Sequence, residues 1–285
     1  MLVLFELGEA RRIPERAARA MVEALNALPV KVFPIHPGDM PAGLDPYRHT
    51  SCHCVLGGIV HVLDACGLDV HRELPWAEPW FLRYQLADGG LTCDNDAYRV
   101  TGECPSSMVG TVPPLEAMLL GDPTTWSPAR TAFVDRAAGF LIGRELHRGS
   151  STVANAEERT SAPAWLQPCF PRLYFYDVVR GVQALVRWAE RRHAVIPRSA
   201  VEVVVAHLAG AFPAGIVRLQ RRSYEGVDTY ALDPTGTRTR QPASPFSLLD
   251  ATSAVGEPSP WVTRQWAETR AGLRRLIEAE RLVEG

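Results

Sequence analysis

Apolar residues recur at spacings of three and four along most of the chain, which is the period of an amphipathic helix. Residues 14–28 place five apolar side chains on one face: Ala18, Met21, Val22, Leu25 and Leu28. Similar patterns predict further helices over 54–67, 75–86, 106–120, 127–148, 174–192, 196–210 and 259–283. Ser127 followed by Pro128 is typical of a helix start, whereas Pro113 and Pro114 predict a kink inside their helix.

Residues 216–233 follow a different pattern. Apolar and polar residues alternate there, and the Gly226-Val227-Asp228 stretch has turn chemistry, so we predict a small β-hairpin. The rest of the pattern predicts an all-α fold. Loops rich in glycine and proline return between paired helices, which indicates divergent repetition of a helix pair of roughly fifty to seventy residues. Such pairs either stack in an open row or close into an α/α toroid.

The length of 285 residues suits one large domain, which we expect to span residues 1–285. We divide it into an N-terminal helix and lead-in (1–45), a repeat core (46–210), and a hairpin with a C-terminal helix (211–285). With 46% hydrophobic and 22% charged residues, the chain has ample material for a core. The net charge of −2 gives no electrostatic case for nucleic acid as a partner.

The chain shows no targeting or membrane signal. Its opening apolar run is short and lacks the basic start and cleavage site of a secretory signal, and no window reaches the eighteen apolar residues of a membrane span. We therefore expect a cytoplasmic protein without a membrane span. In that location its six cysteines are thiols or metal ligands rather than disulfides. Cys66 and Cys169 lie among apolar neighbours and are interpreted as core residues.

The stretch His49-Thr-Ser-Cys-His-Cys54 crowds four possible metal ligands into six residues. In a helix Cys52 and Cys54 would point about 200° apart, so both can face one ion only if residues 49–54 are not yet helical. His49 and Cys52, three residues apart, make a better pair on a helix.

Four segments within residues 45–210 carry a family resemblance. Gln85, Gly89 and Leu91 resemble the Q-x3-G-x-W/F repeat motif of squalene cyclases and protein prenyltransferase β subunits, with Leu91 in the aromatic position. The stretches "GECPSSMVGT", "CFPRLYFYDVVRGVQAL" and "PYRHTSCHCVLGG" are similar to other helix starts of that superfamily. The resemblance implies an α/α toroid, incomplete at this length, with an isoprenoid or other apolar substrate in a central cavity and zinc at its rim.

Two departures from the family pattern concern the chemistry. The sequence Asp94-Asn95-Asp96-Ala97 is not the D-x-D-D acid of cyclases that protonate an alkene. The histidine and cysteine stretch also precedes Cys104, whereas farnesyltransferase-like β subunits order their zinc ligands as Asp, Cys and then His.

In such a toroid the helices that start near 52, 105 and 173 would be the inner ones, with their N-termini at one rim. Thiolate, imidazole and carboxylate are the ligands that zinc prefers, in sets of three or four. The preferred metal set combines Cys52 and Cys104 with one further residue, and Asp177 as fourth ligand or support. The candidates for that further residue are His49, His53 and Cys93. The alternative interpretation is that the cysteines are small buried hydrophobes and the histidines form ordinary hydrogen bonds.

Other polar and aromatic residues are candidates for catalysis or substrate binding. The catalytic candidates are Asp94, Asp96, Asp177 and Tyr176. The substrate-binding candidates are Arg172, Tyr174, Arg180 and Trp165. The aspartates can act as acid and base or merely form a turn. The aromatic rings can face an apolar ligand or a carbocation, or pack in the core. The two arginines, together with Arg148, can bind a diphosphate or remain solvated. The polar stretch Asn155–Arg159 can have a functional role or cap a helix.

Three functions remain open at this point. The first is a terpenoid cyclase-like or prenyltransferase-like enzyme acting on an apolar substrate. The alternative is a non-catalytic toroid that binds a lipid-like ligand or a peptide. The stretch "CHCVLGG" is also similar to the zinc-binding Cys-His-Gly stretch of lanthipeptide-cyclase-like toroids, although it comes early in this chain and lacks the following glycine. A homodimer or a partner subunit would complete a partial ring.

Overall fold

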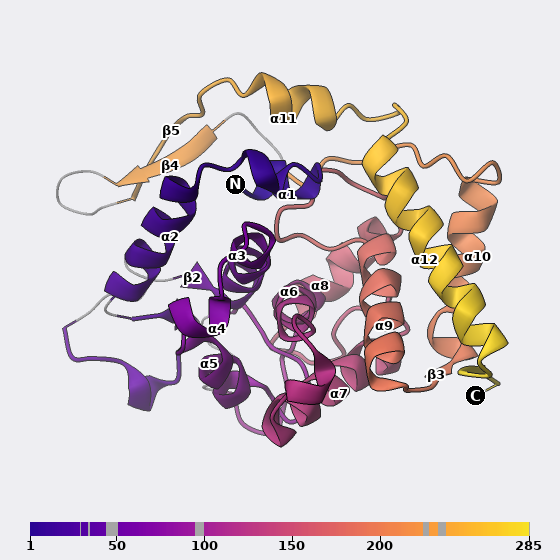
Figure 1. Cartoon of the computed structure of the whole chain (residues 1–285), viewed down its shortest axis with the longest axis horizontal. Helices are drawn as coiled ribbons and strands as arrows, with labels where there is room; N and C mark the ends of the chain where they lie inside the picture. The colour runs from indigo at the N-terminus through magenta and orange to yellow at the C-terminus, as the bar shows by residue number, and fades with distance from the viewer. Residues whose placement is uncertain are drawn as a thin grey trace.

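Helices dominate the chain in the computed structural model, which describes residues 1–28, 30–33, 35–43, 51–94, 100–224, 228–232 and 238–284 (Figure 1). The helices are α1 (Leu2–Glu6), α2 (Glu15–Ala27), α3 (His53–Ala65), α4 (Val70–Glu73), α5 (Ala77–Tyr84), α6 (Met108–Met118), α7 (Pro128–Gly143), α8 (Ala156–Ser161), α9 (Val178–Arg192), α10 (Glu202–Ala211), α11 (Ser247–Thr252) and α12 (Pro260–Glu278). The short strands are β1 (Val32–Phe33), β2 (Ser51–Cys52), β3 (Ile196–Pro197), β4 (Asp228–Leu232), β5 (Arg238–Pro242) and β6 (Leu282–Val283). The predicted all-α class with a small β element is confirmed.

Local sequence chemistry accounts for where several helices begin. The Ser127 hydroxyl accepts the backbone N–H of Arg130, with Pro128 in the first turn of α7, as predicted. Ser107 caps α6 in the same way, by accepting the N–H of Gly110. These caps satisfy N–H groups that have no partner inside the helix.

Helix α6 runs as one helix through Pro113 and Pro114, and ten of its eleven residues are buried. Its main neighbour is α3, and the two backbones approach closely at Gly57. A Cβ atom at Gly57 would lie only 2.4 Å from the carbonyl carbon of Pro113. Glycine is therefore required where α3 crosses α6.

Helices α3, α6 and α9 occupy the middle of the molecule, with α2, α5, α7 and α12 around them (Figure 1). Helix α9 packs against α12 as well as α7 and α6, so helices distant in sequence lie side by side. Helices in the middle of the molecule thus alternate along the chain with helices around them, while repetition of a helix pair stays a prediction. Closure into a toroid stays a prediction. Among the described residues, no helix is both long enough and apolar enough to cross a bilayer.

A small antiparallel hairpin is present, but it lies further along the chain than predicted, with β5 beyond the range 216–233. Strand β4 lies at the end of the predicted range and pairs antiparallel with β5, so that Tyr230 is opposite Arg240. The preceding stretch 216–221 pairs elsewhere: Leu219 donates its N–H to the Glu257 carbonyl, and Gln220 donates to that of Pro168. Residues 216–221, whose alternating pattern predicted a strand of a local hairpin, thus form backbone hydrogen bonds with distant segments instead.

Candidate metal centre

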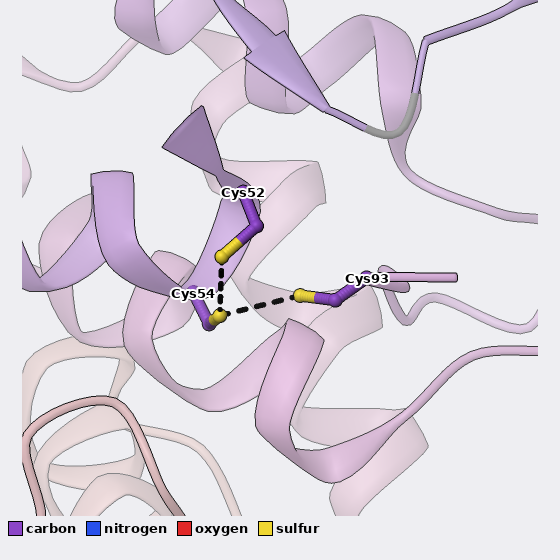
Figure 2. A group of neighbouring side chains, drawn as sticks. All are labelled: Cys52, Cys54 and Cys93. Atoms are coloured by element: carbon purple, nitrogen blue, oxygen red, sulfur yellow. Dashed lines mark hydrogen bonds between the residues drawn. The ribbon is translucent and has the colours of Figure 1, made fainter. Parts of the chain in front are cut away.

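Three cysteine side chains converge at the start of α3 (Figure 2). The Sγ atom of Cys54 lies 2.9 Å from that of Cys52 and 3.3 Å from that of Cys93. All three sulfur atoms lie within 4.8 Å of one another. Thiols so disposed can hold a metal ion.

The backbone at Cys52 explains how Cys52 and Cys54 meet. Cys52 is extended, with φ −80° and ψ 162°, because it belongs to β2, which pairs in parallel with β1. Helix α3 begins only at His53, so the angular offset between neighbouring helical positions does not apply to Cys52. Cys52 is therefore not helical, whereas Cys54 lies in the first turn of α3. Cys54 joins Cys52 and Cys93, and Cys93 is one of the three candidates considered for a further ligand.

Cys93 reaches the other two cysteines from the segment that follows α5. His53 holds this segment, because its Nδ1 atom lies 2.8 Å from the carbonyl oxygen of Thr92, the residue before Cys93. The His53 ring is fully buried, and burial lowers its pKa to about 4. Neutral His53 thus connects the two cysteine-bearing segments.

In the absence of a metal ion, the arrangement of the three side chains favours one thiolate, at Cys52, and two protonated thiols. Hydrogen bonds from Cys54 and Cys93 lower the pKa of Cys52 to about 3. The pKa values of Cys54 and Cys93 are raised, chiefly because their side chains donate hydrogen bonds to Cys52. A cation is needed to ionise all three thiols in this partly buried position, since three thiolates alone would repel one another.

The donor set fits a soft divalent ion. A tetrahedral ion with metal–sulfur bonds of about 2.3 Å requires sulfur atoms about 3.8 Å apart. The sulfur atoms of Cys52 and Cys93, now 2.9 and 3.3 Å from that of Cys54, would have to move outward by roughly 0.5–0.9 Å to bind it. Among the described residues, no histidine, aspartate, glutamate or further cysteine joins the group. Three protein ligands with a fourth position for water or substrate are typical of catalytic zinc sites.

The structure places the other predicted ligands that it describes outside this group. Cys104 lies partly buried in the segment that leads to α6. Asp177 is fully buried, caps α9 by accepting the N–H of Arg180, and pairs with Arg172 at 2.7 Å. Asp94 is partly buried beside Cys93 and is not among the grouped atoms. His49 and Asp96 lie outside the described residues.

A cavity of about 300 Å³ lies between α1, α3, α6, α9 and α12, and two predicted substrate-binding residues, Arg172 and Arg180, line it. Arg180 forms an ion pair with Glu116, with Nη2 and Oε2 2.6 Å apart. Burial opposes the ionisation of Glu116, but Arg180 holds its pKa below the usual value. The Nη2 atom of Arg172 is buried and has no hydrogen-bond partner among the described residues. The cavity is therefore polar and charged, in contrast to the apolar cavity expected from the resemblance.

Sequence reasoning did not identify Glu6, which comes from α1 and also lines this cavity. Its carboxylate accepts the backbone N–H groups of Arg172 and Leu173, the former at 2.7 Å. Burial raises the pKa of Glu6, although Arg172 opposes that effect. Sequence reasoning also did not identify Glu116. The signal in the sequence that could have indicated it as a site residue is that it is the single charged residue of α6.

The cavity and the cysteines lie along the same part of the molecule. Cys54, Gly58 and His61 are spaced by four and three residues in α3, so they share one helix face, and the last two line the cavity. Tyr174 follows the cavity-lining Leu173. Burial raises the pKa of its phenol, and charge on the three cysteines adds to this effect. Tyr174 therefore interacts electrostatically with the three cysteines, and their convergence on one rim stays a prediction.

A second pocket, of about 1000 Å³, is bordered by Trp165, Phe175 and Tyr176. The Trp165 and Tyr176 rings meet edge to face, 5.2 Å apart, and the Tyr176 hydroxyl donates to the Leu146 carbonyl. Both side chains are almost fully buried, so they pack in the core and contribute to the pocket wall. Arg148, another candidate for binding diphosphate, pairs with Glu145 at an exposed position.

Glu158 was missed as an individual residue, although the polar stretch Asn155–Arg159 had been singled out. Its Oε1 atom accepts the N–H of Met108 at 2.6 Å, and Asn155 donates to the carbonyls before α6. Burial raises the pKa of Glu158 to about 7. This stretch thus supports the start of α6 and borders the larger pocket.

Comparisons of this chain with protein-family models, with curated proteins and with solved structures gave no match. The likeness to squalene cyclases and prenyltransferase β subunits consequently stays a prediction that depends on the quoted motifs.

Proposed function

We propose that this protein is a zinc-dependent enzyme of the prenyltransferase or terpenoid cyclase type, acting on an isoprenoid or other apolar substrate that carries an anionic group. The observation that supports it best is the group formed by Cys52, Cys54 and Cys93, beside a cavity that contains guanidinium groups. The motif resemblance supplies the class of substrate.

The three thiols are the residues that would hold zinc. When bound, zinc supplies an activated thiolate or water at its open position. Arg172 and Arg180, which both line the polar cavity, would orient the anionic group there. Tyr174 would shield the metal side from solvent. The larger pocket beside Trp165 and Phe175 shares no lining residue with this cavity and is a separate site.

A non-catalytic protein that holds a lipid-like ligand or a peptide is the second candidate. It is favoured by the ion pairs that already engage both arginines, Arg172 with Asp177 and Arg180 with Glu116. The absence of the D-x-D-D acid motif points the same way.

Metal analysis of the purified protein tests the metal part of the proposal. We expect one equivalent of zinc in the wild type, loss of that zinc in Cys54→Ser and Cys93→Ser, and full retention in the matched control Cys66→Ser. The control changes a partly buried thiol at the other end of α3. A wild-type protein without stoichiometric metal would refute the zinc centre.

Turnover and ligand analysis separate the two functions. Conversion of added prenyl diphosphates, lost in Cys54→Ser, would support the enzyme. An unmodified apolar ligand extracted from gently purified protein, together with no turnover, would support the binding protein.

A further inference from the structure

Helix α10 is apolar on nearly every side and yet lies at the surface. Its sequence, EVVVAHLAGA, has one charged residue, Glu202, at its start. Only Val204 and Leu208 are buried. A helix that is apolar all round is normally enclosed by protein. The exposed apolar side of α10 therefore indicates a surface that binds another protein molecule.

A groove of about 530 Å³ runs between α10 and α12. Val201, Val205 and Ala209 line one wall, and Leu273 and Ile277 line the other. The two helices that line the groove, α10 and α12, lie with the C-terminus at one edge of the molecule (Figure 1).

Exposed apolar side chains continue beyond the groove. Ile277, which lines the groove, is 53% exposed. Val195, just before β3, and Val283, in the paired strand β6, are exposed as well. Contiguous apolar surface of this kind marks interaction sites on soluble proteins.

Charges of both signs border the groove on opposite walls. Glu202 lies on the α10 side, and Arg270 and Arg274 lie on the α12 side. Within the described ranges, none of the three forms an ion pair. Arg198, at the end of the groove, is already paired with Glu284 at 3.0 Å.

We propose that this face is where two copies of the chain associate, groove against groove about a two-fold axis. In a two-fold interface each surface meets itself, so a face with a carboxylate on one wall and guanidinium groups on the other is self-complementary. Glu202 of each copy then faces Arg270 and Arg274 of the other. A purely acidic partner would suit the arginines but would oppose Glu202, which favours a second copy.

Sedimentation velocity on the full chain tests the proposal. We expect a wild-type dimer, and monomers for Ala209→Asp and Ile277→Asp, which change exposed side chains of the two groove walls and should leave the fold intact by circular dichroism. The matched control Val255→Asp, at a position 53% exposed outside the groove, should remain dimeric. A monomeric wild type at concentrations on the order of 100 μM, or dimers that survive both groove substitutions, would overturn the proposal.

Charge exchange provides a second test that does not depend on apolar packing. Glu202→Arg should raise the dissociation constant of the dimer at least about tenfold, because like charges then meet across the axis. Adding Arg270→Glu and Arg274→Glu to that variant should restore association. A triple variant no tighter than Glu202→Arg would contradict the facing of these residues. Neither test depends on the metal centre, so this proposal and the proposed function fail separately.

Discussion

Replacing Gly57 by alanine would insert a methyl group where α3 crosses α6. The new Cβ would lie 2.4 to 2.7 Å from the backbone of Pro113 and Pro114. Those contacts are with the backbone of a buried helix, which cannot rotate away as the end of a flexible side chain can. The two helices would have to separate.

Two effects of opposite sign decide the magnitude. Alanine is favoured over glycine inside a helix by about 1 kcal/mol. Overpacking of a well-packed core costs about 1–3 kcal/mol, and a clash with three backbone atoms belongs at the upper end. We therefore expect Gly57→Ala to lower the free energy of unfolding by about 2 kcal/mol.

Urea unfolding followed by circular dichroism measures this difference, with Gly139→Ala in α7 as the matched control. A Cβ at Gly139 meets no atom within 4 Å, so the helix preference alone should stabilise that variant by about 0.5–1 kcal/mol. The two substitutions should thus shift the urea midpoint in opposite directions. A Gly57→Ala protein as stable as Gly139→Ala would refute the close approach of α3 and α6.

Three further predictions concern charges and metal. Arg180→Ala leaves Glu116 buried without its partner and should cost about 3–5 kcal/mol in urea unfolding, whereas a cost below about 1 kcal/mol would contradict the ion pair. Because burial raises the pKa of Glu158 to about 7, its contribution to stability is present below the unfolded pKa and is lost as pH rises through about 7. Glu158→Gln should therefore remove up to about 3 kcal/mol of pH dependence between about pH 4.5 and 7.5, and an unchanged pH profile would argue against a perturbed carboxyl group. Removing metal with a chelator should lower the melting temperature of the wild type, by an amount equivalent to about 2–3 kcal/mol at saturating zinc. It should leave Cys54→Ser unchanged, and an equal shift in both proteins would contradict zinc binding by Cys54.

The sequence identifies best those helices whose signals are local. Ser127 and Pro128 define the start of α7 through contacts within one turn, and the apolar face of α2 has a regular spacing. Short helices such as α1 and α8 are not predicted from the sequence, because five or six residues are too few to reveal a helical period of apolar residues. The partner of β4 was missed for a related reason, since the pairing of β5 is settled between strands and not within either one.

The candidate site was only partly predictable for the same physical reason. Cys52 and Cys93 were identified by residue type, whereas the role of Cys54 depends on where α3 begins, and pairing of β2 with distant β1 contributes to that start. Asp177 had the right chemistry for a ligand, but a buried arginine five residues earlier and the start of α9 occupy its oxygen atoms. Such competition between partners becomes visible only in three dimensions.

The cysteines of the proposed centre come from both ends of a segment that contains most of α3 together with α4 and α5. An ion held by Cys54 and Cys93 would fasten this segment into a closed loop spanning 39 positions. By the entropy that loop closure removes from the unfolded chain, such a link is equivalent to about 4 kcal/mol. Without the ion, α4 and α5 would then be able to unfold locally while the remaining helices stay folded. Amide hydrogens in α5 should therefore exchange faster in the metal-free protein than in the metal-bound protein.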